Sequence, residues 1–102
     1  MAESDDQMDF FKRADDVIAV ANEQLKVSRS DRVAASTAFA AARFAVWAVC
    51  TTATGAAQVA QRRDQFLENF ITGYRQMLVD NFNDHEKNFD TYHPVLTTPT
   101  PL

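Results

Sequence analysis

The sequence predicts an all-α fold: an antiparallel three-helix bundle with a long third helix. Apolar residues recur at spacings of three and four through most of the chain, which is the period of a helix with one apolar face. Only two glycines and three prolines occur among the 102 residues, and all three prolines lie at or after Pro94. Because glycine and proline are the strongest interrupters of helices, long helices are favoured before Pro94.

The first predicted helix begins near Ser4 and carries a narrow apolar stripe. Ser4 with Gln7 three residues later is a capping-box pattern, and the acidic residues after Ser4 suit the positive end of a helix dipole. The stripe consists of Phe11, Ala14, Ile18, Ala21 and Leu25. A helix with such a stripe is expected to pack that face against other helices.

The second predicted helix is rich in alanine and nearly free of charge. It follows the segment VSRSD, in which Ser28 and Ser30 are possible N-caps, and it extends to about Thr54. Its one internal charge is Arg43, and an arginine at the centre of a membrane span costs about 2.5–3.5 kcal/mol, which weakly apolar alanine does not offset. We therefore predict a core helix surrounded by other helices, with no membrane contact.

The third predicted helix begins around Gln58 and extends to Phe89 or Tyr92. Its apolar residues recur at steps of three and four from Phe66 onward. Gly73 weakens this helix by about 1 kcal/mol relative to alanine but need not end it. The sequence leaves two possibilities open, a continuous helix or a break near Gly73 after which the chain folds back.

The length, net charge and cysteine content of the chain indicate the number of domains, the partners that are disfavoured and the cellular compartment. A chain of this length forms one domain, and we assign residues 1–92 to a single helical domain and the Thr/Pro-rich residues 93–102 to an extended or disordered tail. The net charge of −4 disfavours nucleic acid and a basic membrane-binding surface. The lone Cys50 and an acidic N-terminus without an apolar signal core favour the cytoplasm.

Three segments of the chain resemble a known family. They are VIAVANEQLK at 17–26, AARF at 41–44 and GYRQMLVDNFNDHEKNFD at 73–90. These segments are similar, in the same order, to a small bacterial family that is best represented in Proteobacteria and catalogued as a domain of unknown function. The resemblance covers most of residues 10–90. It implies a short cytoplasmic helical protein without an assigned activity, so it supplies no catalytic residues and no cofactor.

Arg43 is the first candidate for a functional role. If consecutive helices are antiparallel, Arg43 in the second helix lies level with Asp15 in the first. We predict a buried ion pair between Arg43 and Asp15 that sets the helix register, in which loss of one partner typically costs about 3–5 kcal/mol. The alternative is that Arg43 binds an anionic ligand in a cleft.

The segment DNFNDHEKN at residues 80–88 is the second candidate. On a helical wheel Asn81, Asp84 and His85 lie on or beside the apolar face, where a carboxylate and an imidazole can bind a ligand or a metal, or move protons. Adjacent residues are about 100° apart around a helix, so Asp84 and His85 are poorly placed to share one ion. No nucleophile motif, phosphate loop or Cys/His metal spacing is present, so we predict no metal site and favour a non-enzymatic protein.

The end of the third helix predicts self-association. Antiparallel alignment places the end of the first helix level with Asn81, so that Phe82, His85 and Phe89 extend past it and lack cover within one chain. Exposed aromatic residues at helical spacing mark association surfaces, and a two-fold homodimer covers each overhang with its mate. If the third helix folds back near Gly73 instead, the protein is a monomer.

Two classes of function follow from these observations. In the first, the protein is a non-enzymatic homodimer that presents helical surfaces to a protein partner. In the second, it is a small-molecule or metal-binding protein that uses Arg43 or the region of Asp84 and His85. No sequence motif decides between the two classes.

Overall fold

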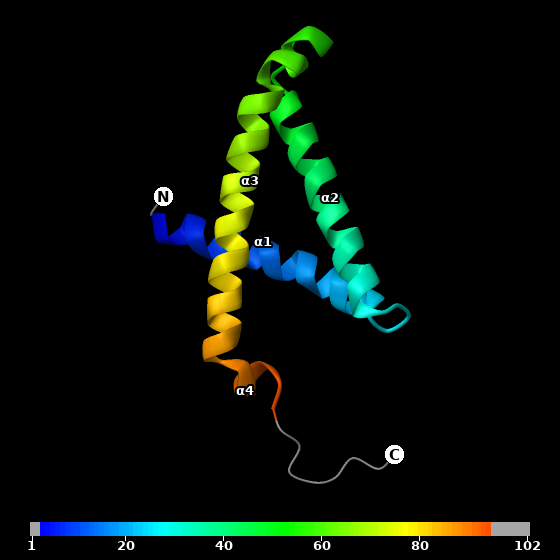
Figure 1. Cartoon of the computed structure of the whole chain (residues 1–102), viewed down its shortest axis with the longest axis vertical. Coiled ribbons are helices and arrows are strands. Elements are labelled where there is room, and N and C mark those ends of the chain that lie inside the picture. Colours follow the sequence, from blue (N-terminus) through cyan, green and yellow to red (C-terminus); the bar gives the residue numbers. More distant parts are fainter. Residues whose placement is uncertain (1–2, 95–102) are drawn as a thin grey trace. The chain divides into compact units, whose positions relative to one another are not determined.

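The computed structural model describes the backbone of residues 3–94 and the side chains of residues 7–94. Four helices follow one another along the chain, namely α1 (Glu3–Gln24), α2 (Ser30–Cys50), α3 (Ala56–Lys87) and α4 (Phe89–Tyr92) (Figure 1). No strand occurs between residues 3 and 94. The predictions of an all-α fold and of a long third helix are confirmed.

The chain divides into two units, Met1–Thr52 with α1 and α2, and Ala53–Leu102 with α3 and α4. The assignment of residues 1–92 to one domain stays a prediction. Of the predicted tail, only His93 and Pro94 belong to the described part of the chain, so its extended or disordered character lies outside the described residues.

α1 begins one residue before Ser4, the predicted N-cap. Because α1 begins at Glu3, Ser4 lies inside the helix rather than before it. The side chain of Ser4 lies outside the described residues, and so does the capping hydrogen bond expected between Ser4 and Gln7. Farther along α1, Lys12 and Asp16 form an exposed ion pair of 3.3 Å one turn apart, as is usual on a solvated helix surface.

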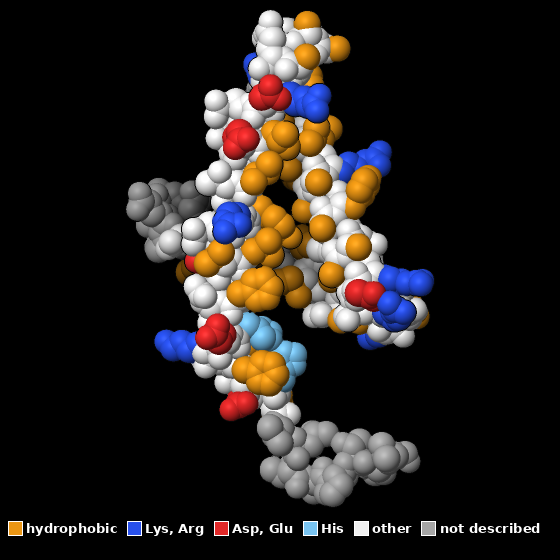
Figure 2. Space-filling model, in the orientation of Figure 1, with side chains coloured by type: hydrophobic (Ala, Val, Ile, Leu, Met, Phe, Trp, Pro, Cys, Tyr) orange, Lys and Arg blue, Asp and Glu red, His pale blue; other side chains and the backbone are white. Residues whose placement is uncertain are grey.

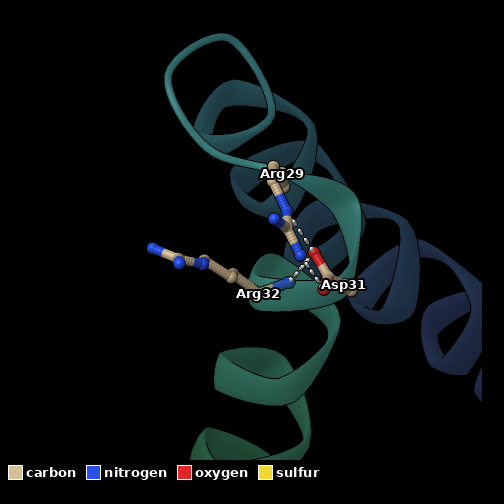
Figure 3. A network of polar contacts seen from close by, with 3 residues as sticks. All are labelled: Arg29, Asp31 and Arg32. Atoms are coloured by element: carbon tan, nitrogen blue, oxygen red, sulfur yellow. Dashed lines mark hydrogen bonds and ion pairs between the residues drawn. The ribbon is translucent and has the colours of Figure 1, made fainter.

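A charged cluster forms the start of α2. The N-cap is Arg29, in extended conformation, and not Ser28 or Ser30 as expected. The Arg29 guanidinium donates to the Asp31 carboxylate at 3.1 Å from Nε and 2.6 Å from Nη2, and the backbone N–H of Arg32 donates to the same carboxylate at 3.0 Å (Figure 3). Asp31 thus satisfies an N–H of the first turn, where the helix dipole favours a negative charge, and no serine cap is needed.

The connection from α2 to α3 begins and ends earlier in the chain than predicted. α2 ends at Cys50 rather than near Thr54. The backbone N–H and the hydroxyl of Thr51 both donate to the carbonyl of Ala48, at 3.4 and 2.8 Å. α3 begins two residues before the expected Gln58, whose side-chain oxygen accepts the backbone N–H of Thr54 at 2.9 Å. This hydrogen bond links the connecting segment to the first turn of α3.

α3 passes through Gly73 without a break. A Cβ added at Gly73 meets nothing within 4 Å, so the glycine is not needed for a close approach in the single chain. Of the two possibilities left open by the sequence, the continuous helix is the one observed. The chain turns later, at Asn88.

Few side chains are buried within the described residues, where the one buried hydrophobic residue is Val33. Hydrophobic side chains are visible over long stretches of the surface (Figure 2). On α2, large apolar residues that were expected in a core are more than half exposed, namely Phe39, Phe44, Val46 and Trp47. The predicted enclosure of α2 is therefore not found within its own unit, and a compact three-helix bundle is not shown.

α2 is the one described helix that is long and apolar enough to cross a membrane, judged by length and composition alone. Its apolar window has a mean hydropathy of 1.6. Eight of residues 33–50 are alanine, and Arg43 interrupts the stretch. The same length and composition occur in core helices of soluble proteins, so the predicted absence of membrane contact stays a prediction.

Candidate functional site

The chain changes direction at Asn88, between α3 and α4. The backbone dihedrals of Asn88, φ −117° and ψ 31°, lie outside the α-helical region. Its N–H donates to the carbonyl of Asp84 at 2.9 Å, which closes the last turn of α3, and its carbonyl accepts the N–H groups of Thr91 and Tyr92 at 3.0 and 3.2 Å. A single residue therefore ends one helix and begins the next.

α4 is a single turn because the chain leaves the helix at His93. His93 precedes Pro94, and proline disfavours helical backbone in the residue before it; the dihedrals of His93 are φ −131° and ψ 72°. The N–H of His93 donates to the carbonyl of Phe89 at 2.8 Å. This turn brings side chains eight positions apart next to each other, and we call residues 84–93 the α3–α4 corner.

Asp84 is the centre of hydrogen bonding in the α3–α4 corner. Its carboxylate accepts hydrogen bonds from the hydroxyl of Tyr92 and from Nδ2 of Asn88, the latter at 2.8 Å. The Tyr92 bond, followed by the Asn88 bond, holds the pKa of Asp84 below its ordinary value. Desolvation opposes this shift, and weaker electrostatic interactions with His85 and Lys87 add to it. The Asp84 carboxylate in turn raises the pKa of Tyr92.

The two histidines of the chain meet in this corner. The Nε2 atoms of His85 and His93 lie 2.6 Å apart, so one imidazole donates its N–H and the other accepts it. The ring of His85 stacks on Tyr92 with centroids 4.7 Å apart, and the ring of His93 stacks on Phe89 at 4.8 Å. Figure 2 shows the two imidazoles in pale blue beside hydrophobic rings. Both imidazoles are therefore held by aromatic faces.

An open groove borders the corner along α3. It has a volume of about 480 Å³ and is lined by Leu78, Asn81, Phe82, His85, Glu86 and Phe89. The side-chain nitrogen of Asn81 donates to the carbonyl of Met77 at 2.8 Å, so this amide is partly engaged with its own helix. The three residues predicted as an interface, Phe82, His85 and Phe89, all line the groove.

Arg43 and Asp15 are not brought together in the single chain. α1 and α2 diverge from the turn that joins them (Figure 1), and both residues lie far from that turn. Both are exposed, and within residues 7–94 neither forms an ion pair. Their predicted buried ion pair, and the alternative of anion binding by Arg43, stay predictions.

Asn81, Asp84 and His85 all lie in the last two turns of α3, and of the three Asn81 and His85 line the groove. Two of their partners, Tyr92 and His93, were not predicted from the sequence, because His93 was assigned to the tail and Tyr92 had no assigned role. A proline directly after His93 and an asparagine five residues before it were the available signals for a turn. Among the described residues, no group of three or more His, Cys, Asp or Glu side chains is placed to hold a metal ion.

These features define a small all-α protein whose long helix ends in a corner of aromatic rings and histidines. The model of the family described as "Protein of unknown function (DUF3144)" matches residues 10–85, and the chain belongs to this family. The match includes Asn81, Asp84 and His85 and stops before the rest of the corner. The resemblance to a family of unknown function is thus confirmed. No curated protein and no solved structure matches the chain.

Proposed function

We propose that this protein is a non-enzymatic cytoplasmic protein that acts as a homodimer and contacts a protein partner. The observation that carries the proposal is an apolar stripe along α3 that its own unit leaves uncovered. The large side chains of the stripe are between 42% and 72% exposed; they are Leu67, Phe70, Ile71, Tyr74, Met77, Leu78 and Phe82. Their spacing of three and four places them on one side of the helix.

Such a stripe requires a covering surface for energetic reasons. Helices in water derive most of their stability from packing of the apolar face, not from intrinsic propensity. Each buried Leu or Phe side chain contributes about 1.5–3 kcal/mol relative to the exposed state. The short α4 is the other helix in the same unit, and it lies beyond the stripe in sequence.

The lengths of the helices favour a second copy as part of this cover. α3 has 32 residues, whereas α1 has 22 and α2 has 21. If α1 and α2 pack on α3 in the predicted bundle, they cover at most about 33 Å of a helix about 48 Å long. Because α2 connects to the start of α3 through only residues 51–55, the uncovered part is the end of α3, with Phe82 and His85.

A second copy is well suited to this end of the molecule. Phe82 is 72% exposed and borders the open groove, so each chain offers both a projecting ring and a concavity. A two-fold axis pairs the same patch on both subunits and leaves no open end. The proposal also assigns α2 to the interior of the assembled bundle rather than to a membrane, since Arg43 is costly in lipid.

The test compares two substitutions that introduce the same charge. Phe82→Asp removes a central contact of the proposed dimer, whereas Val27→Asp changes a residue that is 87% exposed in the turn after α1. We expect the wild-type chain and Val27→Asp to sediment as dimers, and Phe82→Asp to raise the dissociation constant by about 30-fold or more, as for an interface hot spot. A wild-type chain that sediments as a monomer at all concentrations, or equal effects of the two substitutions, contradicts the proposal. Circular dichroism establishes that each variant is helical.

The second candidate function is binding of a small ligand or a metal in the region of Asp84 and His85. The contact between His85 and His93 favours it, because it adds a second imidazole to the residues identified from the sequence. The two functions are compatible, since dimerisation depends on the apolar stripe and ligand binding depends on the imidazoles.

A further inference from the structure

We propose that His85 and His93 together bind one divalent transition-metal ion, with Zn²⁺ as the representative ion. They are the two histidines of the whole chain, and the fold places their Nε2 atoms 2.6 Å apart. Imidazole nitrogen is the commonest protein ligand for metals and suits zinc, copper and nickel. The site does not depend on the proposed dimer, because one chain supplies both nitrogens.

The Nε2 atoms of His85 and His93 lie close together because the chain changes direction at the α3–α4 corner. On a continuous helix, residues eight apart are separated by about 12 Å along the axis. The turn at Asn88 and the single-turn α4 remove this separation. Zn–N bonds of about 2.0–2.1 Å at a tetrahedral angle place two ligand nitrogens about 3.3 Å apart. The imidazoles therefore need to separate by less than about 1 Å to admit an ion.

The neighbours of both imidazoles orient them for this role. His85 stacks on Tyr92 with an angle of 12° between the rings, and His93 stacks on Phe89 with an angle of 27°. Tyr92 is itself held by its hydrogen bond to Asp84. Residues outside the ligand set that fix ring orientation commonly strengthen metal binding.

The charge around the site favours a cation. The Asp84 carboxylate is next to His85 in the chain and interacts with it electrostatically. It is occupied by Tyr92 and Asn88, so it contributes charge and not a metal bond. Two protein ligands leave at least two tetrahedral positions of Zn²⁺ for water or another ligand, one more than in the open sites of zinc enzymes.

The competing interpretation is a simple N–H···N hydrogen bond between the two rings, without any role in metal binding. The two interpretations differ in a measurable way, because a hydrogen-bonded pair without metal affinity leaves the protein unchanged when Zn²⁺ is added. Both side chains are exposed, so added metal reaches them without unfolding.

The experiment titrates Zn²⁺ into the full-length chain and follows heat by calorimetry and the two imidazole signals by NMR. We expect saturable binding that shifts both imidazole signals together. His85→Gln and His93→Gln should each weaken binding by about tenfold or more, since even the loss of an outer-shell partner costs 10–100-fold. Cys50→Ser, which removes the chain's one thiol, serves as the control and should bind as the wild type does.

The proposal is overturned if Zn²⁺ produces no saturable change, or if either His→Gln variant binds with wild-type affinity. It is also overturned if Cys50→Ser loses the binding, because the thiol would then be a ligand. Far-ultraviolet circular dichroism of each variant separates loss of the site from loss of the helices. A failure of this test leaves the dimer proposal intact, because the dimer test uses Phe82 and requires no metal.

Discussion

Two polar clusters, one at the start of α2 and one at the α3–α4 corner, differ in how far apart their residues lie in the sequence. At the start of α2, Arg29 and Asp31 interact although they are only two positions apart. At the α3–α4 corner, Asp84 and Tyr92, like His85 and His93, are eight positions apart. The first cluster forms a helix start, whereas the second brings together side chains that neither helix can supply alone.

The difference shows what a helix start and a candidate binding site each require. A helix start leaves N–H groups of the first turn without intrahelical acceptors, and a carboxylate nearby in sequence can accept one of them. A binding site needs functional groups from separate elements at one point, which requires a change of chain direction. The exposed ion pair at α2 is expected to contribute little to stability, because solvent screens it. The corner adds ring stacking to its hydrogen bonds and is expected to respond more strongly to substitution.

The largest expected effect comes from Tyr92→Ala, which removes both the hydrogen bond to Asp84 and the stack on His85. We expect α4 to detach and the nuclear Overhauser contacts between the two imidazoles to disappear, with amide-exchange protection of His93 lowered about tenfold, as for loss of an aromatic pair and a hydrogen bond. Tyr92→Phe keeps the stack and is the matched control, with a smaller effect expected. Equal behaviour of the two variants would show that stacking does not hold the corner.

A rise in pH should distinguish the two clusters. The pKa of Tyr92 is raised above its ordinary value of 10.0, so its contribution is fully present below about pH 10 and is lost as pH rises through the raised pKa. The pKa of Asp84 is lowered from 3.8, so its contribution is lost only as pH falls through that lower value. Arg29 keeps its charge in base, because its pKa is raised by Asp31.

NMR at neutral pH and near pH 12 checks this difference. The imidazole contacts in the corner should be lost in base, while the start of α2 stays unchanged. In acid both clusters should weaken, because the pKa of Asp31 is lowered in the same direction as that of Asp84. A Tyr92 that titrates at or below 10.0 would exclude the hydrogen bond to Asp84.

A smaller effect is expected from Gly73→Ala, which examines the long helix that leads into the corner. The substitution should stabilise the protein against urea by about 1 kcal/mol, because alanine is the better helix former and the added methyl group meets open space. Gly55→Ala is the control, since Gly55 also has open space but lies outside the helix, at the N-cap of α3. Destabilisation by Gly73→Ala alone would indicate that another surface packs closely at this position.

The smallest effect is expected from Asp31→Asn, which removes the negative charge from the cluster at the start of α2. The amide oxygen of asparagine can still accept a hydrogen bond from the N–H of Arg32. Both residues of the lost ion pair, Arg29 and Asp31, are exposed. We expect the thermal midpoint to move by about 2 °C or less. A larger shift would mean that the start of α2 matters as much to stability as the α3–α4 corner.

Some features of the fold were predictable because they depend on neighbours in sequence. The period of apolar residues predicted three main helices, and the absence of proline before Pro94 predicted a long third helix. Helix ends were less predictable, since the N-cap of α2 is Arg29 and not Ser28 or Ser30. Several residues compete for each cap, and small differences in hydrogen-bond geometry decide among them.

Part of the candidate site was also predictable. Asn81, Asp84 and His85 follow helical spacing, so their common location at the end of α3 could be read from the sequence. Their partners could not, because the position of His93 depends on where α3 stops. Gly73 was the expected weak point, yet the chain turns at Asn88, whose side chain donates to Asp84. Pro94 acts later, at His93, where α4 ends.

By itself, the sequence determined which segments are helical, since helix formation depends on contacts three and four residues apart. It also determined which faces are apolar, as the exposed stripe along α3 demonstrates. Only the tertiary structure decided that His85 meets His93 and that Asp84 holds Tyr92. The physical reason is that these contacts span eight residues, a distance that a helix keeps apart and that only a change in backbone direction closes.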